Sequence, residues 1–380
     1  SQMSSTMMQV LPSTLPMIVN GVPKLPEPIL RSQREITIAE DESVWLDFSL
    51  RGLEIGTHHG KIRILGEDGL KIDDTRFFTV EVNSAARVLV VPGPGAEPRF
   101  LMNALAPLET RENGEAAFRC QTAQPEQLPE IDFSPFAAVV LLDPPSLSPI
   151  VWSDLGDYVR RGGGLVTFLG RNAKPESLAM PAVSELLPGK LNRVPWRASS
   201  DDLTLALREN SHPILRVLQP IATSIPWEEF PVAKHWIAKP SDDEGHVVLR
   251  FSNGKPALLE RDLGEGRSLM FTAPISDPLN VAGRKPWARG TDSWPYLVLV
   301  NETVKYTAHG ANEPLNYLVG QIASLSQSAD DPNRLQMFHP QGSWQEVVAR
   351  GRRLDIPFTD VPGVYRLKTP LPGSPPRGFA

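Results

Sequence analysis

Cysteine is almost absent from this chain of 380 residues, which contains one, Cys120. A single thiol cannot form an internal disulfide, and no set of cysteines and histidines has the spacing of a zinc site. So few cysteines are typical of the cytoplasm, and equally of a bacterial periplasmic domain that is stabilised by its core. The sequence therefore predicts no metal ion and no other cofactor, and it leaves the compartment open.

Long apolar runs and an excess of positive charge are also missing. No apolar run reaches the ~18 residues that a membrane-spanning helix needs. The formal net charge is −6 and the pI is about 5.7, so we do not expect nucleic acid as a partner. The first residues have no basic start and do not resemble a signal peptide. Both ends read as cuts inside a longer protein, so any membrane attachment would come from segments outside this chain.

Proline is plentiful, at 38 residues, and argues against a helical bundle because proline breaks long helices. Residues 1–83 instead have the patterns of β-strands. The segment MIVNGVPK places Asn-Gly between apolar residues, which indicates a hairpin. Alternating apolar and polar residues follow in EITIAEDESVWLDFSL and in GKIRILGEDGLKIDDTRFFTVEV. Closely spaced turn signals predict an immunoglobulin-like β-sandwich for this part.

From Ala86 onward, continuous apolar strands alternate with segments of helical spacing. They are, in order, RVLVVPG, PRFLMNALAP, FAAVVLLD, IVWSDLGDYVRR and GGGLVTFLG. This order predicts a three-layer α/β domain, of the flavodoxin and amidotransferase type, over residues 84–328. Helical character returns in WPYLVLVNETVKYTAHG and NYLVGQIASL. After the polar linker SQSADDPN, short strands predict a small β module over residues 329–380, which is either complete or part of a second immunoglobulin-like domain.

Three consecutive glycines, Gly162 to Gly164, follow a predicted helix and precede a predicted strand. A phosphate cradle needs the reverse order, in which a strand leads through glycines into the N-terminus of a helix. We therefore interpret the glycines as a helix C-cap and a turn into a buried strand. The loop of interest is at the other end of that strand, GRNAK at residues 170–174, because ligands bind at the carboxyl edge of open α/β sheets.

The segment FAAVVLLDPPSLSPIVWSDLGDYVRRGGGLVTFLG, residues 136–170, resembles the class I glutamine amidotransferase-like superfold. The resemblance is closest to the non-catalytic versions in BatA-like, aerotolerance-regulator membrane proteins of bacteria. The segments GEDGLKIDDTRFFTVEV and FTDVPGVYRL resemble strands of the β-sandwiches that flank the domain in those proteins. The resemblance covers most of the chain and implies an extracytoplasmic, membrane-anchored context.

In catalytic members of that superfold, a cysteine occupies a sharp turn between a strand and a helix, and histidine and glutamate complete a triad. The equivalent turn here is Phe168-Leu169-Gly170-Arg171-Asn172, which has no cysteine or serine. The segment 267–277, where the histidine is expected, offers Thr272 and Asp277 but no histidine. The resemblance therefore implies no catalytic residue. If a ligand pocket survives, we expect it at Asp143, Arg171 and Asn172, on adjacent strand ends.

The other candidate groups have ordinary structural interpretations. Cys120 is expected to be a half-buried thiol on a strand. His58 and His59 are neighbours on a strand, would point to opposite faces, and are expected to be an ordinary surface pair. His212 is expected beside a helix cap. Four tryptophans, at positions 227, 236, 287 and 294, could line a groove for a partner or a sugar, although core packing is the more common role.

Two functions remain open from the sequence. The first is a non-enzymatic interaction or scaffold region of a membrane-anchored bacterial protein, in the periplasm or on another extracytoplasmic face, with unidentified protein partners. The second is a hydrolase or transferase of unknown substrate that uses Asp143, Arg171 or Cys120. The sequence does not predict an oligomeric state, and the cytoplasm stays open as a location.

Overall fold

The chain divides into two units, each with its own core. Unit 1 comprises Ser1–Ser84 and Glu313–Ala380, and unit 2 comprises Ala85–Asn312. The structure is a computed structural model. It describes residues 2–20, 22–38, 43–48, 50, 52–65, 73–197, 203–207, 212–241, 245–274, 286–288, 293–309, 315–326, 332–349, 353–357, 359–368 and 377–380.

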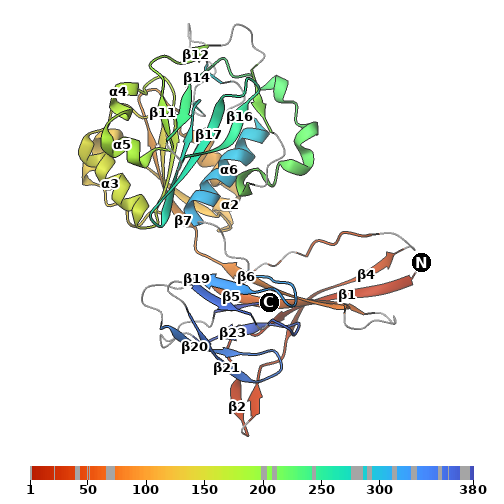
Figure 1. Cartoon of the computed structure of the whole chain (residues 1–380). Coiled ribbons are helices and arrows are strands. Elements are labelled where there is room, and N and C mark those ends of the chain that lie inside the picture. Colours follow the sequence, from red (N-terminus) through yellow and green to blue (C-terminus); the bar gives the residue numbers. More distant parts are fainter. Residues whose placement is uncertain are drawn as a thin grey trace. The chain divides into compact units, whose positions relative to one another are not determined.

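Unit 2 is an α/β domain around an eight-stranded mixed sheet of order β13-β16-β17-β18-β10-β9-β7-β8 (Figure 1). The strands β8, β7, β9, β10 and β18 are parallel to one another, and β17, β16 and β13 continue the sheet beyond β18 in antiparallel fashion. Their bounds are β7 (Ala86–Pro92), β8 (Phe118–Thr122), β9 (Ala138–Leu142), β10 (Gly164–Phe168), β13 (Leu205–Ala206), β16 (His246–Phe251), β17 (Pro256–Leu263) and β18 (Gly266–Phe271). The predicted α/β architecture is confirmed, with the difference that the sheet is mixed.

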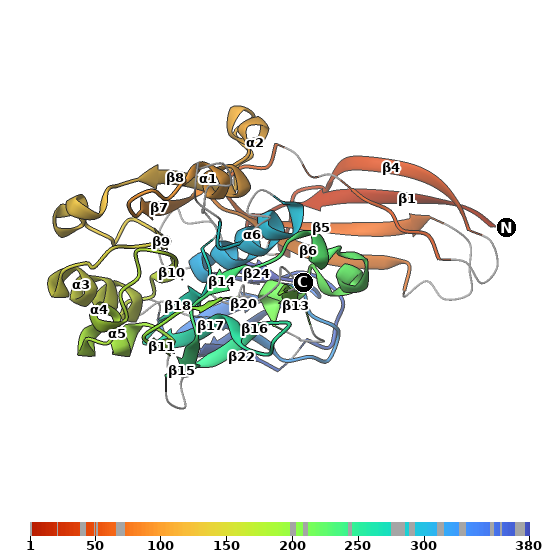
Figure 2. The ribbon, with the colours of Figure 1, turned by 90° about the horizontal axis from the view of Figure 1, so that it is seen from above.

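Helices cover both faces of this sheet (Figure 2). Successive residues of a strand face opposite sides, so Ala138 and Val140 of β9 join one core while Val139 and Leu141 join the other. The first core contains side chains of α1 (Arg99–Leu105) and α6 (Trp294–His309), and the second contains those of α3 (Pro149–Arg160) and α5 (Pro181–Leu186). The remaining helical segments are α2 (Leu108–Glu112), α4 (Pro175–Leu178), η1 (Pro125–Glu130), η2 (Pro213–Leu215), η3 (Gln219–Ser224) and η4 (Trp227–Glu229).

Short strand pairs complete unit 2 around the main sheet. They are β11 (Gly189–Leu191) with β15 (Ala238–Pro240), and β12 (Trp196–Arg197) with β14 (Lys234–His235).

The triple glycine has the predicted role of a helix C-cap. Gly162 has a φ of 105°, and its N–H donates to Val159 O at 2.9 Å, while the N–H of Gly163 donates to Tyr158 O at 3.0 Å. These two hydrogen bonds form a Schellman motif, which satisfies the last carbonyls of α3. The glycines therefore end a helix and take no part in binding an anion.

Unit 1 combines the two ends of the chain, each of which forms its own antiparallel sheets. One sheet has the order β4-β1-β5-β6, and another has the order β21-β20-β23-β24. The bounds are β1 (Gln2–Leu11), β2 (Met17–Val19), β3 (Val22–Lys24), β4 (Ile29–Ile38), β5 (Gly56–Leu65), β6 (Thr75–Val82), β19 (Ala323–Ser326), β20 (Arg334–Phe338), β21 (Trp344–Val348), β22 (Arg353–Ile356), β23 (Tyr365–Leu367) and β24 (Arg377–Phe379). The predicted hairpin at MIVNGVPK is confirmed as β2 and β3, with Asn20 at a φ of 52° in its turn.

This organisation differs from the predicted division into residues 1–83, 84–328 and 329–380. The two β ends form one unit because residues of β24 pack against β5 and β6, and because Asn316 hydrogen-bonds to both backbone groups of Thr79. The boundary after the α/β domain also falls at residue 312 and not at 328. Of the predicted linker, residues 327–331 lie outside the described part.

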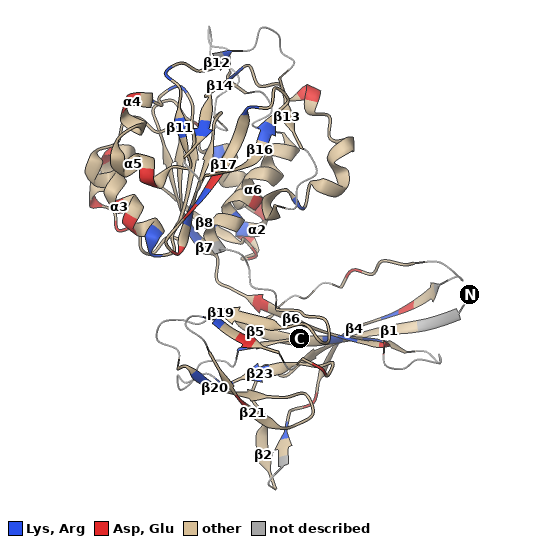
Figure 3. Ribbon diagram, in the orientation of Figure 1, with Lys and Arg blue, Asp and Glu red and all other residues tan. Residues whose placement is uncertain are grey.

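Two local predictions are wrong. The described residues between 43 and 50 form no strand, and Trp45 among them is 95% exposed. The segment NYLVGQIASL is not helical, because its last residues belong to β19, which pairs with β22. In the described part of the chain, no helix combines the length and the apolar character needed to span a bilayer. Lys and Arg are interspersed with Asp and Glu along both units (Figure 3).

Candidate functional site

The predicted site residues lie together at the carboxyl ends of β9 and β10. Asp143 directly follows β9, while Arg171 and Asn172 lie in the turn after β10. Asp143 is buried and has a φ of 47°, a left-handed conformation that aspartate tolerates better than most residues. This edge of the sheet is the usual place for a ligand in an open α/β fold.

The carboxylate of Asp143 accepts hydrogen bonds from two backbone N–H groups and from the side chain of Asn172. Its Oδ2 accepts a hydrogen bond of 2.9 Å from the N–H of Arg171, and its Oδ1 accepts one of 2.9 Å from the N–H of Asn172. The Asn172 side-chain amide donates to Asp143 Oδ2 at 3.1 Å, to Asp143 O at 3.1 Å and to Pro94 O at 2.9 Å. These hydrogen bonds connect the loops that follow β7, β9 and β10.

Two glycines make this close packing of loops possible. A Cβ at Gly170 would lie 2.6 Å from Asp143 Cγ, and a Cβ at Gly93 would lie 1.9 Å from Asp143 O. Any larger residue at either position would separate the loops. The carbonyl of Gly170 in turn accepts a hydrogen bond of 2.8 Å from Trp236 Nε1. The turn is therefore held from both sides by buried groups.

This arrangement limits what the turn can do chemically. In enzymes with a nucleophile at such a turn, backbone N–H groups at the turn stabilise the negatively charged oxygen of the intermediate. Here the N–H groups of residues 171 and 172 are occupied by Asp143. The turn also carries no thiol or hydroxyl group. Asp277, from the segment where a histidine would be expected, lies outside the described residues.

Cys120 does not supply the missing nucleophile. It lies in β8, the edge strand of the sheet, where burial raises the pKa of its thiol to about 11. A thiol with such a pKa is almost entirely protonated at neutral pH and is a poor nucleophile. Over the described ranges, no group of three His, Cys, Asp or Glu side chains could hold a metal ion.

Basic and aromatic side chains lie beside the turn. The ring centroids of Trp236 and Trp287 are 6.0 Å apart, and both side chains are buried. Lys234 Nζ is 4.7 Å, and the Arg171 guanidinium carbon 5.9 Å, from the centre of the Trp287 ring. Burial lowers the pKa of Lys234, and the positive charges of Arg197 and Arg171 lower it further.

The other predicted tryptophans lie elsewhere. Trp227 packs against the opposite core, and Trp294 is 45% exposed. The four tryptophans therefore do not form one groove, and Trp236 and Trp287 serve packing.

A second polar cluster lies on the α6 face of unit 2. His212 Nε2 is 2.8 Å from Glu260 Oε2, and Arg267 Nη1 is 3.6 Å from Glu260 Oε1. The Arg267 guanidinium carbon lies 4.0 Å from the centre of the Tyr306 ring. Arg267 is at the start of β18, so this cluster is at the opposite edge of the parallel strands from Asp143. His212 was expected beside a cap formed by Asn210 or Ser211, but His212 is itself the cap of η2, because its Nδ1 accepts a hydrogen bond of 3.3 Å from the N–H of Ile214. Residues 210 and 211 lie outside the described part, and no sequence pattern pointed to Glu260.

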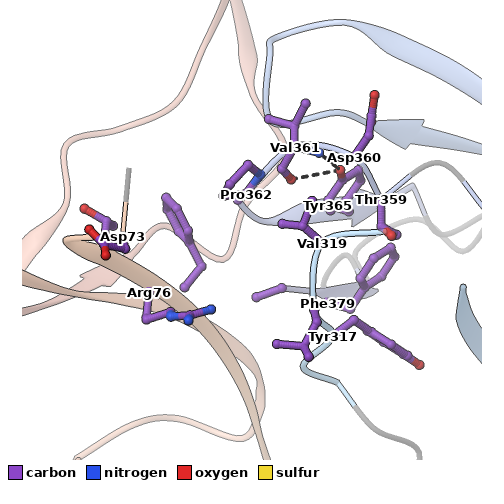
Figure 4. A pocket seen from close by; sticks show the side chains of 15 residues that line it. Asp73, Arg76, Tyr317, Val319, Thr359, Asp360, Val361, Pro362, Tyr365 and Phe379 are labelled. Carbon is purple, nitrogen blue, oxygen red and sulfur yellow. Dashed lines mark hydrogen bonds between the residues drawn. The ribbon is translucent and has the colours of Figure 1, made fainter. Parts of the chain in front are cut away.

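Unit 1 contains a pocket of about 350 Å³ that no pattern in the sequence predicts. Its wall includes four aromatic side chains, those of Phe77, Tyr317, Tyr365 and Phe379. Figure 4 shows Asp73 and Arg76 on one side of the opening, facing the segment from Thr359 to Pro362. The Tyr365 hydroxyl donates to Val361 O at 3.0 Å, which fixes that segment.

The sequence does not predict this pocket, because its two sides come from opposite ends of the chain. Residues 73–77 precede the α/β domain, and residues 317–380 follow it. No local pattern in the sequence could bring them together.

No protein family and no curated protein matches this chain. Among solved structures, a cytoplasmic protein from Salmonella typhimurium is 16% identical, with a TM-score of 0.43 over 58% of this chain and 98% of its own. A ThuA-like protein from Parabacteroides merdae is 15% identical, with a TM-score of 0.41 over 59% and 90%. Another from Bacteroides uniformis is 13% identical, with a TM-score of 0.40 over 59% and 94%.

ThuA-like proteins belong to the class I glutamine amidotransferase-like superfamily. At these identities and TM-scores, the similarities establish neither a shared fold nor a shared activity for this chain.

Proposed function

We propose that this chain is a non-enzymatic interaction or scaffold region of a larger, membrane-anchored bacterial protein, on its extracytoplasmic face. Unit 2 would be a degenerate glutamine amidotransferase-like domain, and unit 1, which the β segments at the two ends of the chain form together, would be immunoglobulin-like in character. Its partners would be proteins and not nucleic acid, and segments outside this chain would attach it to the membrane.

One observation carries the non-enzymatic part of the proposal. The Asp143 carboxylate occupies the two N–H groups of the turn at residues 171 and 172, where a catalytic relative would stabilise an oxyanion. The site is thus filled by a group of the chain itself. A hydrolase or transferase acting there would need Asp143 as a free base or acid, and that carboxylate accepts three hydrogen bonds from residues 171 and 172.

The edge of a sheet in unit 1 supports a role in binding proteins. β4 is ten residues long and is paired with β1 on one side, as an edge strand of its sheet. The described side chains of β4 are largely exposed, including Ile29 at 60% and Leu30 at 51%. An exposed edge strand offers unpaired backbone N–H and C=O groups to a strand from a partner.

A glutaminase assay tests the absence of catalysis. We expect the purified chain to release no ammonia from glutamine, and to hydrolyse no chromogenic ester, above the rate in buffer. Asp143→Asn and Cys120→Ser variants serve as matched controls and should give the same background. Turnover by the wild-type chain that either variant abolishes would overturn the proposal.

The cellular part of the proposal is tested on the full-length protein in its host. We expect it in the membrane fraction, with this region cleaved by protease added outside the cytoplasmic membrane. Recovery of the protein in the soluble cytoplasmic fraction contradicts the proposed location. So does a region that resists added protease in cells whose outer membrane has been permeabilised.

A further inference from the structure

A second pocket of unit 1, of about 300 Å³, adjoins the one in Figure 4 and shares Phe77, Pro362 and Gly363 with it. Its lining consists of five prolines, five other apolar residues, one glycine and one arginine, Arg366. Proline has no backbone N–H, so those five positions offer a ligand no donor from the main chain. The guanidinium of Arg366 is the charged group of an otherwise apolar wall.

Arg366 lies in β23 and is 3% exposed. Its Nη2 donates to Pro12 O at 3.0 Å, its Nη1 donates to Val364 O at 3.5 Å, and its buried Nε has no hydrogen-bond partner among the described residues. No carboxylate in the described ranges pairs with it. Burial lowers the pKa of this guanidinium to about 10, because its charged form has little contact with water there.

A purely structural role does not account for this residue. Joining Pro12 to β23 requires one or two donors, which a neutral glutamine also has, whereas a guanidinium carries five N–H donors and a charge. Burying a charge without a counter-ion is unfavourable, and two carbonyl oxygens offset only part of that cost. A carboxylate in the adjoining pocket would complete the pairing, because arginine binds carboxylates with strong, directional hydrogen bonds.

We propose that this pocket binds a small apolar monocarboxylate, whose carboxylate pairs with Arg366 while its apolar part fills the proline-rich cavity. The volume is at the lower end of the range for ligand pockets, about 300–1,000 Å³, which favours a compact ligand. Proline rings keep the cavity in shape before binding, so little entropy is lost on association. A free acid and the C-terminal carboxylate of a peptide share this chemistry.

Calorimetric titration of the whole chain with phenylacetate and with its neutral amide, phenylacetamide, tests the charge requirement. We expect the acid to bind at least about tenfold more tightly than the amide, since a hydrogen bond to a charged group has that effect or more. Acetyl-Gly-Leu with a free carboxylate and the same dipeptide with a C-terminal amide form the second arm. If phenylacetate is the tighter-binding acid, the ligand is a free acid, and if acetyl-Gly-Leu is, the ligand is the C-terminus of a peptide. Equal affinities for acid and amide in both comparisons overturn the proposal.

Three variants locate the binding. Arg366→Gln keeps a donor for Pro12 O and should weaken acid binding by about ten- to a hundredfold. Leu25→Trp, which adds bulk to the lining without changing Arg366, should abolish binding. Arg334→Gln removes an exposed positive charge elsewhere in the unit and should leave affinity unchanged. If Arg366→Gln does not fold, the affinity of Leu25→Trp decides whether the acid binds in this pocket. Wild-type affinity in Leu25→Trp, or no binding of either acid to the wild-type chain, refutes the site.

Discussion

Asn172 forms three hydrogen bonds to Asp143, one from its backbone N–H and two from its side-chain amide. The two residues come from the ends of adjacent parallel strands, β9 and β10. In an enzyme, such a pair of strand ends presents free groups to a substrate. Here Asp143 and Asn172 form their hydrogen bonds with each other, so these polar groups are not free to bind a substrate at this edge of the sheet.

The first prediction concerns this pairing. Asp143→Asn keeps a residue that accepts the φ of 47° but replaces one acceptor oxygen by a donor and removes the charge. We expect the amide hydrogens of Arg171 and Asn172 to exchange about ten- to a hundredfold faster, since a hydrogen bond to a charged group contributes roughly 1.5–3 kcal/mol. Hydrogen exchange followed by mass spectrometry or NMR measures this. Asp154→Asn, at an exposed position of α3, is the control, and unchanged exchange at 171 and 172 in Asp143→Asn would show that the carboxylate does not hold the turn.

The second prediction concerns the thiol of Cys120. Burial raises its pKa from 9.0 to about 11, which reduces its thiolate fraction at pH 7.5 about a hundredfold. Iodoacetamide should therefore alkylate the folded chain about a hundredfold more slowly than the same chain in concentrated urea. Mass spectrometry of timed samples gives both rates. Equal rates would restore Cys120 as a candidate nucleophile.

Apolar runs and glycines in the sequence were enough to predict the α/β domain and the meeting of Asp143 with Asn172. Continuous apolar strands are buried on both faces, and parallel strands bring their carboxyl ends to one edge. The role of Asp143 could not be predicted, because it depends on a left-handed backbone at that residue and on the absence of a Cβ at Gly170. A sequence pattern records neither the conformation nor the distance.

The errors arose where contacts distant in sequence determine local structure. NYLVGQIASL has helical spacing, but Gly320 turns with a φ of 86° and residues 323–326 pair with β22, some thirty positions later. The burial of Arg366 could not be predicted for the same reason, because it depends on contacts distant in sequence. In VYRLK it occupies what reads as an ordinary strand position, and only the return of the chain's C-terminal end to Pro12 buries it.

The third prediction concerns Glu260, whose carboxylate is buried near His212 and Arg267. Burial alone raises the pKa of this carboxyl, but the hydrogen bond from His212 and the nearby positive charges outweigh it, so the pKa is lowered. A lowered folded-state pKa stabilises the fold fully above the unfolded pKa, about 4.3, and the stabilisation is lost as the pH falls through the folded value. The difference in melting temperature between wild type and Glu260→Gln should therefore be large at pH 7 and shrink below about pH 4.3.

Thermal melts of the intact chain, followed by tryptophan fluorescence, measure this difference. Glu185→Gln, at an exposed carboxylate whose salt bridge to Arg160 lies on the surface, should melt like the wild type at every pH. If the melting temperature of Glu260→Gln stays below that of the wild type by the same amount from pH 7 to pH 3, the side chain of Glu260 stabilises the fold by its packing and not by its charge.

The fourth prediction concerns His59, which is fully buried in unit 1 and not at the surface as predicted, with its Nδ1 3.0 Å from Thr79 Oγ1. Burial, followed by the positive charges of Arg366 and His58, lowers the pKa of its ring to about 3. We expect the ring to stay neutral at pH 5 in the folded chain, as reported by its nitrogen chemical shifts. The unfolded chain binds a proton there near pH 6.5, so the stability of unit 1 should fall as the pH drops from about 6.5 towards 3.

Arg366→Gln gives this prediction a second readout. Removing the guanidinium eliminates one of the charges that oppose protonation, so the pKa of His59 should rise, while Arg334→Gln, at an exposed site, should leave it unchanged. A carboxylate bound at Arg366 should raise the pKa of His59 in the same direction, because it neutralises the same charge. His59 then reports on occupancy of the neighbouring pocket, and a ring that titrates near pH 6.5 in the folded wild-type chain would contradict both its burial and its coupling to Arg366.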